Sequence, residues 1–150
     1  MKLTVSKLNK FLLFKLPSAF FCGVRVKEID VNKCVVSVKH RWINQNPFNS
    51  MYFAVQAMAA ELSTGALVMF QIAKSGRKIS MLVANNKGNF TKKATGRITF
   101  TCNDGHLIEK AILETIATGE GQTFWMKSIG TNETGIQVSE MDFEWSVRVK

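Results

Sequence analysis

The stretch that decides the fold is SMYFAVQAMAAELSTGALVMFQI, residues 50–72. It is mostly apolar and rich in alanine and methionine, and it contains no proline and a single glycine, Gly65. This composition predicts a long helix over about residues 50–66, which ends near Gly65 or a little beyond it. A helix that is apolar on all sides has to be buried. We therefore expect the rest of the chain to form a sheet that curls around this helix.

The segments before and after this helix show alternating helix and strand patterns. Strands interrupted by one long buried helix predict an α+β domain, in which an antiparallel sheet wraps around that helix. In chain order, we expect an N-terminal helix over 3–14, strands over 20–29 and 34–41, the central helix, one long bent strand over 79–93, a strand over 97–102, a short helix over 106–117, and strands over 122–129 and 136–149.

Length and composition predict one domain over residues 1–150. The chain has 150 residues, of which 46% are apolar, and domains most often have about 100–150 residues. The apolar run 11–24 is interrupted by Lys15 and Pro17, so we expect no membrane span. The three cysteines form no CxxC pair, which predicts reduced thiols, no metal site and a cytoplasmic location.

The charge of the chain favours anionic partners. Twenty Lys and Arg against eleven Asp and Glu give a net charge of +9, which suits nucleic acid, phosphorylated cofactors or membrane headgroups. The basic residues are dispersed, however, and the densest pairs are Arg77-Lys78 and Lys92-Lys93. Because no nucleic-acid-binding motif is visible, we expect no nucleic-acid partner. A solvated basic surface and a dedicated anion site are both open on the charge alone.

Glu61 is the one ionisable residue in the apolar stretch 54–62. In one interpretation it lies on an exposed stripe of the helix, together with Gln56, Ser63 or Thr64. In the other it is a carboxyl group in an apolar pocket, where burial tunes its pKa and it acts as a base or a nucleophile. The sequence pattern alone leaves both interpretations open.

No familiar catalytic motif accompanies Glu61. The chain contains no G-x-S-x-G elbow, no phosphate-binding P-loop, no dinucleotide-binding glycine motif and no H-E-x-x-H. Only His40 and His106 could serve as a general base in a nucleophile–histidine pair, and a partner such as Cys34 or Cys102 stays open as an alternative.

Residues 46–61, NPFNSMYFAVQAMAAE, resemble the signature of hotdog-fold acyl-CoA thioesterases of the phenylacetyl-CoA type. That signature is N-x-x-G-[ST]-x-H-G-G, followed by a helix that carries Asp or Glu. Residues 89–96, NFTKKATG, also resemble the family's F-x-[KR]-P-A-x-G strand ending. The resemblance implies a hotdog fold over most of the chain, within a largely uncharacterised thioesterase-like branch. Aligned without a gap, Asn46 falls on the motif Asn, Asn49 on the first Gly, Ser50 on Ser/Thr, Tyr52 on His, Phe53 and Ala54 on the Gly pair, and Glu61 on the helix acid.

The resemblance implies hydrolysis of a fatty-acyl or aryl-acyl CoA, with coenzyme A entering only as part of the substrate and no further cofactor. Glu61 would act as the base or nucleophile, and Asn46 would position the water. Backbone N–H groups of Tyr52 and Phe53, at the helix N-terminus, would bind the thioester oxygen. Ser50 would be either a hydrogen-bonding helper or the N-cap of the helix.

The phosphate groups of coenzyme A would need cationic contacts. Lys92, Lys93 and Arg97 are the candidates for this role, and Arg77 or Lys78 are further ones. Each of these side chains is also explained as an ordinary exposed charge at the end of a strand.

The resemblance also implies a homodimer with its active sites across the interface; pairing of dimers into tetramers stays open. Glu61 lies more than two turns into the helix, so it need not meet Asn46 or Phe53 of its own chain. Bulky Tyr52 and Phe53 in place of His-Gly favour an alternative function, the non-catalytic binding of an acyl group or acyl-CoA. A dehydratase of the same fold would need a histidine motif that the chain lacks.

Overall fold

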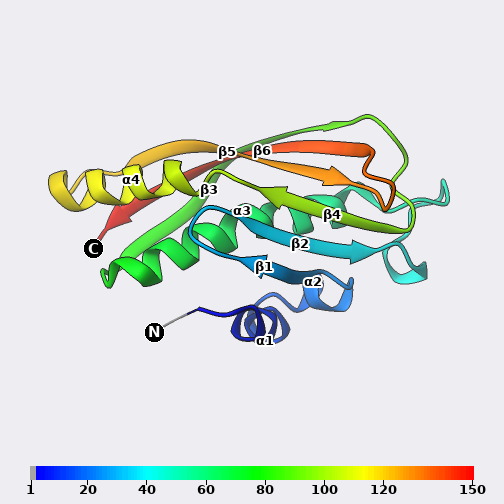
Figure 1. Ribbon diagram of the computed structural model, residues 1–150, viewed down its shortest axis with the longest axis horizontal. Coiled ribbons are helices and arrows are strands. Elements are labelled where there is room, and N and C mark those ends of the chain that lie inside the picture. The colour runs from blue at the N-terminus through cyan, green and yellow to red at the C-terminus, as the bar shows by residue number, and fades with distance from the viewer. Residues whose placement is uncertain (1–2) are drawn as a thin grey trace.

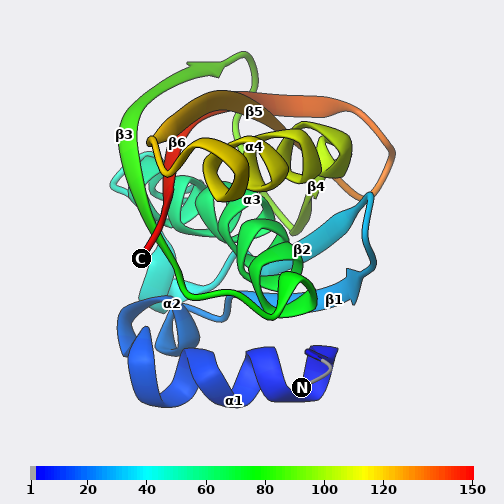
Figure 2. The same ribbon diagram turned by 90° about the vertical axis from the view of Figure 1, so that its left-hand side faces the viewer.

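A six-stranded antiparallel sheet curves around one long helix in the computed structural model, which describes residues 3–150 (Figures 1 and 2). This is the α+β architecture expected from the sequence. The strand order is β1-β2-β4-β5-β6-β3. In chain order the elements are α1 (Val5–Lys15), α2 (Pro17–Phe21), β1 (Arg25–Ile29), β2 (Cys34–Lys39), a 3-10 turn (Trp42–Asn44), α3 (Phe53–Ser75), β3 (Ile79–Phe90), β4 (Arg97–Cys102), α4 (Gly105–Thr118), β5 (Gln122–Thr131) and β6 (Gln137–Val149).

The central helix α3 is longer than the sequence predicts. It runs for 23 residues, past Gly65, and ends at Gly76, whose φ of 67° closes the helix in the left-handed conformation. The expected end near Gly65 is wrong because this glycine serves packing. A Cβ at position 65 would lie 2.9 Å from Cζ2 of Trp145 on β6. The absence of a side chain therefore lets the indole ring of β6 lie directly on the helix.

Two buried hydrogen bonds fix α3 against the inner face of the sheet. The indole Nε1 of Trp145 donates to Oγ1 of Thr64 at 2.9 Å, and the hydroxyl of Ser63 donates to Oγ of Ser128 on β5 at 2.7 Å. Neutral hydrogen bonds of this kind contribute about 0.5–1.5 kcal/mol each to stability. Because they are directional, they also set the rotation of the helix and therefore the direction in which each of its side chains points.

By length and composition, α3 is apolar enough to cross a membrane, with a mean hydropathy of 1.4 over its most apolar window. In this fold 61% of that window is buried. The helix packs on strands of the sheet and on α4, which closes the end where α3 finishes (Figure 2). The apolar character of α3 is thus explained by its place as the core helix.

The two edges of the sheet differ. At the β1 edge, the side-chain amide of Asn9 on α1 takes the place of a neighbouring strand: Nδ2 donates to Val26 O at 3.0 Å, and Val26 N–H donates to Oδ1 at 2.9 Å. At the other edge, β3 pairs with β6 alone. It is one long strand with an irregularity between Val83 and Asn85, as the sequence predicts, although the bulge comes slightly earlier. Among the described residues, β3 is the uncovered edge.

The N-terminal region departs from the expected pattern. The predicted strand over 20–29 is wrong in its first half, because Pro17 begins the short helix α2 and β1 starts only at Arg25. Proline is favoured at the first position of a helix, where its missing N–H costs nothing. The guanidinium of Arg25 lies 3.6 Å from the centroid of the Phe20 ring and donates to Phe20 O. This contact fastens α2 to the strand that follows it.

The cysteines give a direct test of the core. Cys34 and Cys102 are cross-strand neighbours on β2 and β4 and are fully buried, and burial raises the pKa of each thiol to about 12. Such thiols stay protonated and unreactive at neutral pH, which argues against a catalytic Cys–His pair at either position.

Cys22, in contrast, is partly exposed. We therefore expect Ellman's reagent to titrate Cys22 alone in the folded protein and all three thiols after denaturation.

The matched control for this titration is Cys22→Ser, which should leave no reactive thiol until the protein is unfolded. Rapid reaction of a second thiol in the folded protein would contradict the burial of the Cys34–Cys102 pair between β2 and β4.

Candidate functional site

The loop before α3 is organised by Asn46. Its Oδ1 accepts hydrogen bonds from the backbone N–H groups of Phe48 at 2.9 Å and Ser50 at 3.2 Å. Its Nδ2 donates to Oγ of Ser50 at 3.0 Å and to Met51 O at 3.3 Å. Both N–H bonds of the amide are therefore used inside the loop. In this state Asn46 positions the loop and has no N–H left over for a water molecule.

Ser50 does not cap the central helix. The N-cap of α3 is Tyr52, which makes no side-chain capping hydrogen bond, and the Ser50 hydroxyl is engaged with Asn46 instead. Of the two interpretations of Ser50, the N-cap is wrong and the hydrogen-bonding helper remains. Asn49, which stands where the thioesterase motif has glycine, has a φ of 57°. Asparagine is one of the few residues that adopt this conformation readily.

The N-terminus of α3 keeps free backbone donors. The Tyr52 N–H donates to Asn44 O at 2.9 Å, so this expected donor to a substrate is already occupied. The N–H groups of Phe53 and Ala54 make no hydrogen bond to residues 3–150, as is usual for the first turn of a helix. Because the helix dipole places partial positive charge here, these two donors form a suitable site for a carbonyl oxygen that gains negative charge.

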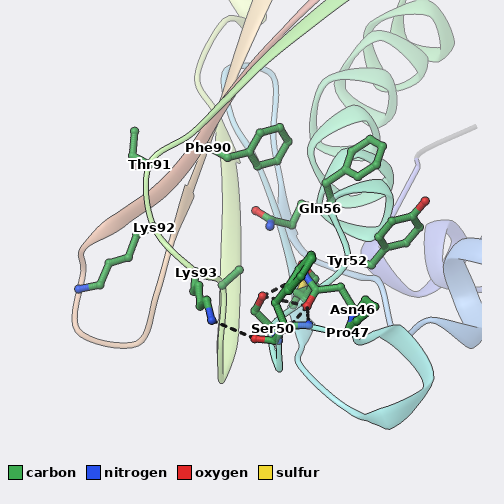
Figure 3. A pocket seen from close by; sticks show the side chains of 13 residues that line it. Asn46, Pro47, Ser50, Tyr52, Gln56, Phe90, Thr91, Lys92 and Lys93 are labelled. Atoms are coloured by element: carbon green, nitrogen blue, oxygen red, sulfur yellow. Dashed lines mark hydrogen bonds between the residues drawn. The ribbon is translucent and has the colours of Figure 1, made fainter.

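A cleft of about 540 Å³ lies between this helix end and the segment after β3 (Figure 3). Tyr52 and Phe53 meet edge to face with ring centroids 5.1 Å apart, and Phe53 meets Phe90 in the same way at 6.2 Å. The cleft is thus apolar over much of its wall and polar at the loop. Its lining includes Asn46, Phe48, Ser50, Met51, Tyr52, Phe53, Gln56, Phe90, Thr91, Lys92, Lys93 and Ala94.

Two of the predicted cationic residues lie at this cleft. Lys92 and Lys93 line it, and the Lys93 ammonium donates to Phe48 O at 3.0 Å. Arg97 does not line it: its Nη1 donates to Oγ of Ser37 at 3.3 Å, and its backbone N–H donates to Glu133. The pair 77–78 follows the far end of α3, about 34 Å along the helix axis from the cleft. The structure therefore places Lys92 and Lys93 at the cleft, and it places Arg97 and the pair 77–78 outside the cleft lining.

Glu61 lies in a different cavity from Asn46 and Phe53. Its own cavity, of about 250 Å³, is bounded by residues 15–19 at the α1–α2 junction and by Met58 and Leu62 of α3. The carboxyl group makes no hydrogen bond or salt bridge with the described residues. Burial raises the pKa of Glu61 above its usual value. Within one protomer, the acid and the backbone donors are thus separate.

The other polar residues near Glu61 do not form an exposed stripe. Ser63 and Thr64 are fully buried, and Gln56 is 4% exposed. The interpretation of these residues as an exposed stripe of the helix is therefore wrong.

Gln56 was missed as a site residue, although it lies three positions after Phe53 and four after Tyr52. Residues at this spacing share one helix face, and this spacing was the available signal. Its Oε1 is buried without a hydrogen-bond partner among the described residues.

Solved structures share this fold along almost the whole chain. The protein PA5026 from Pseudomonas aeruginosa, of unknown function and described as a probable thioesterase, has a TM-score of 0.83 at 22% identity and covers 100% of this chain and 99% of its own. A protein of unknown function from Chlorobaculum tepidum has a TM-score of 0.85 at 13% identity and covers 99% of both chains. Thioesterase HI1161 from Haemophilus influenzae has a TM-score of 0.76 at 12% identity, covering 99% and 93%.

These similarities confirm the hotdog fold that the sequence predicts. No curated protein matches the sequence. A family described as a domain of unknown function, DUF4442, matches residues 6–147, a range that leaves out only the first residue of α1 and the last two of β6 and that contains the linings of both cavities. The chain therefore belongs to the DUF4442 family and has a hotdog fold.

Proposed function

We propose that this protein is an acyl-CoA thioesterase, which hydrolyses a fatty-acyl or aryl-acyl CoA. The observation that carries the proposal is Glu61, a carboxyl group in a small cavity at the α1–α2 junction, with a raised pKa and no hydrogen-bond or salt-bridge partner among the described residues. Partial burial of an unpaired acid costs free energy, and acids whose pKa is shifted in this way are concentrated at functional sites. Two similar structures are described as thioesterases, which supports this class of reaction.

In the proposed reaction, the Glu61 carboxylate removes a proton from water while the water oxygen attacks the thioester carbon. The backbone N–H of Phe53, joined by that of Ala54, stabilises the oxyanion that forms. The carbon–sulfur bond then breaks, and the leaving thiolate of coenzyme A takes the proton from Glu61. Direct attack by the Glu61 carboxylate, which would give an anhydride that water then hydrolyses, is the alternative route.

The proposed active site needs two protomers. Glu61 and the free donors of α3 lie in different cavities of one chain, so a second copy has to bring the acid to the donors. The uncovered β3 edge offers unpaired backbone groups through which two sheets can join. In such a homodimer, the loop organised by Asn46 would come from one protomer and Glu61 from its partner.

Lys92 and Lys93, which line the cleft, would contact the phosphates of coenzyme A. We expect the dimer to be located in the cytoplasm.

A non-catalytic acyl-CoA-binding protein is the second candidate. The observation that favours it is the aromatic contact of Phe53 with Tyr52 and Phe90, because these rings occupy space in front of the helix N-terminus. A cleft narrowed in this way could hold an acyl chain without presenting its carbonyl carbon to water. Binding without turnover in the experiment below would favour this function.

The first prediction concerns Glu61. A panel of short, long and aryl acyl-CoAs, followed by thiol release, should reveal a hydrolysed class. Glu61→Ala should lower kcat by at least about 100-fold, the usual contribution of a general base. The base acts when ionised, so kcat should rise with pH through the Glu61 pKa. The midpoint of this rise should lie above 4.5, the ordinary pKa of a glutamate side chain. Glu109→Ala, on the exposed face of α4, is the control. Equal activity of wild type and Glu61→Ala would contradict the assignment.

The second prediction isolates the backbone donor of Phe53. Phe53→Pro removes this N–H at the first position of α3, where proline is tolerated, and Tyr52 already has the extended conformation (φ −59°, ψ 135°) that precedes proline. We expect kcat to fall by about 100- to 1000-fold, as for loss of one oxyanion donor, with Tm nearly unchanged. Phe53→Ala keeps the N–H and is the control. A proline variant as active as the alanine variant would exclude this donor.

The third prediction tests the shared site. Phe53→Pro and Glu61→Ala should each be inactive, but a refolded mixture contains heterodimers in which one of the two sites has both native groups. Activity should recover to about one quarter of wild type for random pairing of protomers. A mixture of Glu61→Ala with Glu61→Gln should recover nothing. If native mass spectrometry shows heterodimers and no activity returns, each site is built within a single chain.

A further inference from the structure

Three large apolar side chains are exposed where α2 ends and where the 3-10 turn follows β2. Phe21, the last residue of α2, is 61% exposed, and Trp42 and Ile43 in the turn are 84% and 52% exposed. Figure 1 shows α2 beside the end of β2, from which the turn begins. None of the three lines the cleft or the Glu61 cavity. We refer to these three side chains as the Trp42 surface.

The backbone beneath the Trp42 surface is held in place by two contacts. The buried amide of Asn44 donates from Nδ2 to Cys22 O at 2.9 Å, which joins the turn to the end of α2. The Arg41 guanidinium lies against Gly23, where a Cβ would be 2.6 Å from Nη2. The exposed rings therefore project from a fixed backbone. Apolar side chains grouped in this way on a surface indicate a contact with another body.

The charge beside the Trp42 surface is positive. Burial and the neighbouring charge of Arg41 both lower the pKa of Arg25, so the two guanidinium groups lie close to each other. No salt bridge among residues 3–150 includes either arginine. Two cations placed together without a carboxylate repel each other, and an anion bound beside them would remove that cost.

Most acids of the chain lie away from this region. No Asp or Glu precedes Glu28, which pairs with Lys33, and none occurs between Asp30 and Glu61. Eight of the eleven lie between positions 104 and 144, in α4, β5, β6 and their connections. Figure 2 shows α4 and β5 at the top of the molecule and α2 at the bottom. Of these eight, Glu133 reaches the end of β4 and accepts from the Arg97 N–H. This asymmetry of charge would turn the Trp42 surface toward an anionic body.

We propose that the protein docks on an anionic lipid bilayer through the Trp42 surface. Tryptophan is enriched at the membrane–water interface, and arginines beside such rings match the phosphates of lipid headgroups. A symmetric contact between two copies would place the arginines of one copy against those of the other, which is unfavourable. The proposed dimer joins instead through β3, at the opposite end of the strand order from β1 and β2.

Cosedimentation with vesicles tests this docking. The wild type should bind phosphatidylcholine vesicles that contain about one third phosphatidylglycerol, and should bind pure phosphatidylcholine at least about 10-fold more weakly. Salt at about 1 M should also weaken the binding. Trp42→Ser should lower the partition coefficient on anionic vesicles by at least about 10-fold, as for loss of one buried apolar side chain, and Arg41→Gln by about 5-fold.

Two matched variants control for these changes. Leu113→Ser alters a 62% exposed side chain on α4, and Arg77→Gln removes the same charge as Arg41→Gln at an exposed position beyond the other end of α3. Both should bind anionic vesicles much as the wild type does. The Tm of Trp42→Ser should stay near that of wild type, because the side chain is mostly in solvent.

Fluorescence identifies the residue that enters the bilayer. Trp42 emission should shift to shorter wavelength on anionic vesicles, whereas Trp42→Phe, which keeps an apolar ring, should still bind without that shift. Absence of wild-type binding, or equal binding by Trp42→Ser, would overturn the proposal. Loss of the dimer in Trp42→Ser, measured by native mass spectrometry, would show that a second copy covers this surface and would also overturn it. No substrate is used, so the result does not depend on thioesterase activity.

Discussion

The contact between α3 and the inner face of the sheet is the constraint on which the rest of the molecule depends. Gly65 lets the Trp145 ring lie on the helix, and the hydrogen bond from Trp145 to Thr64 fixes the helix rotation. With that rotation set, the N-terminus of α3 opens into one cavity and Glu61 into another. A quarter turn of the helix about its axis would carry the Glu61 side chain away from its cavity, so the packing of the helix and the position of its acid are decided by the same few atoms.

Much of this architecture follows from local sequence patterns. The strand Arg97–Cys102 alternates cleanly, and its bounds are those of β4; Gly119 ends α4 in the left-handed conformation that glycine favours. The errors arise where one residue type serves two purposes. Gly65 indicates a helix end by propensity, yet it leaves space for the indole ring of Trp145, 80 positions later. Pro17 stops one helix and also begins another. Only the tertiary partner distinguishes these cases, and no local window contains it.

The candidate site was predictable where it depends on chain-local geometry. Asn49, which falls on a glycine of the motif, has the left-handed conformation that glycine favours, and Glu61 is partly buried and lines a cavity, which is closer to its pocket interpretation than to an exposed stripe. The occupation of the Tyr52 N–H by Asn44 was not predictable, because it depends on how a 3-10 turn packs beside the helix. Gln56 was missed for the opposite reason. Its spacing from Tyr52 was visible, but an amide in an apolar helix is usually assigned to the solvent side.

The late pairing of β3 has a consequence for how the chain folds as it is made. Ile79 lies opposite Val149 in the β3–β6 ladder, and β3 pairs with no other strand, so the strand that follows α3 has no partner until β6 has been synthesised. When α3 has just been made, only β1, β2 and the short helix α2 can cover it, and β4, α4 and β5 join them as they are synthesised. Synthesis therefore passes through a stage in which a helix with the hydropathy of a membrane span is partly exposed, and chaperone binding at that stage would protect it until β6 arrives.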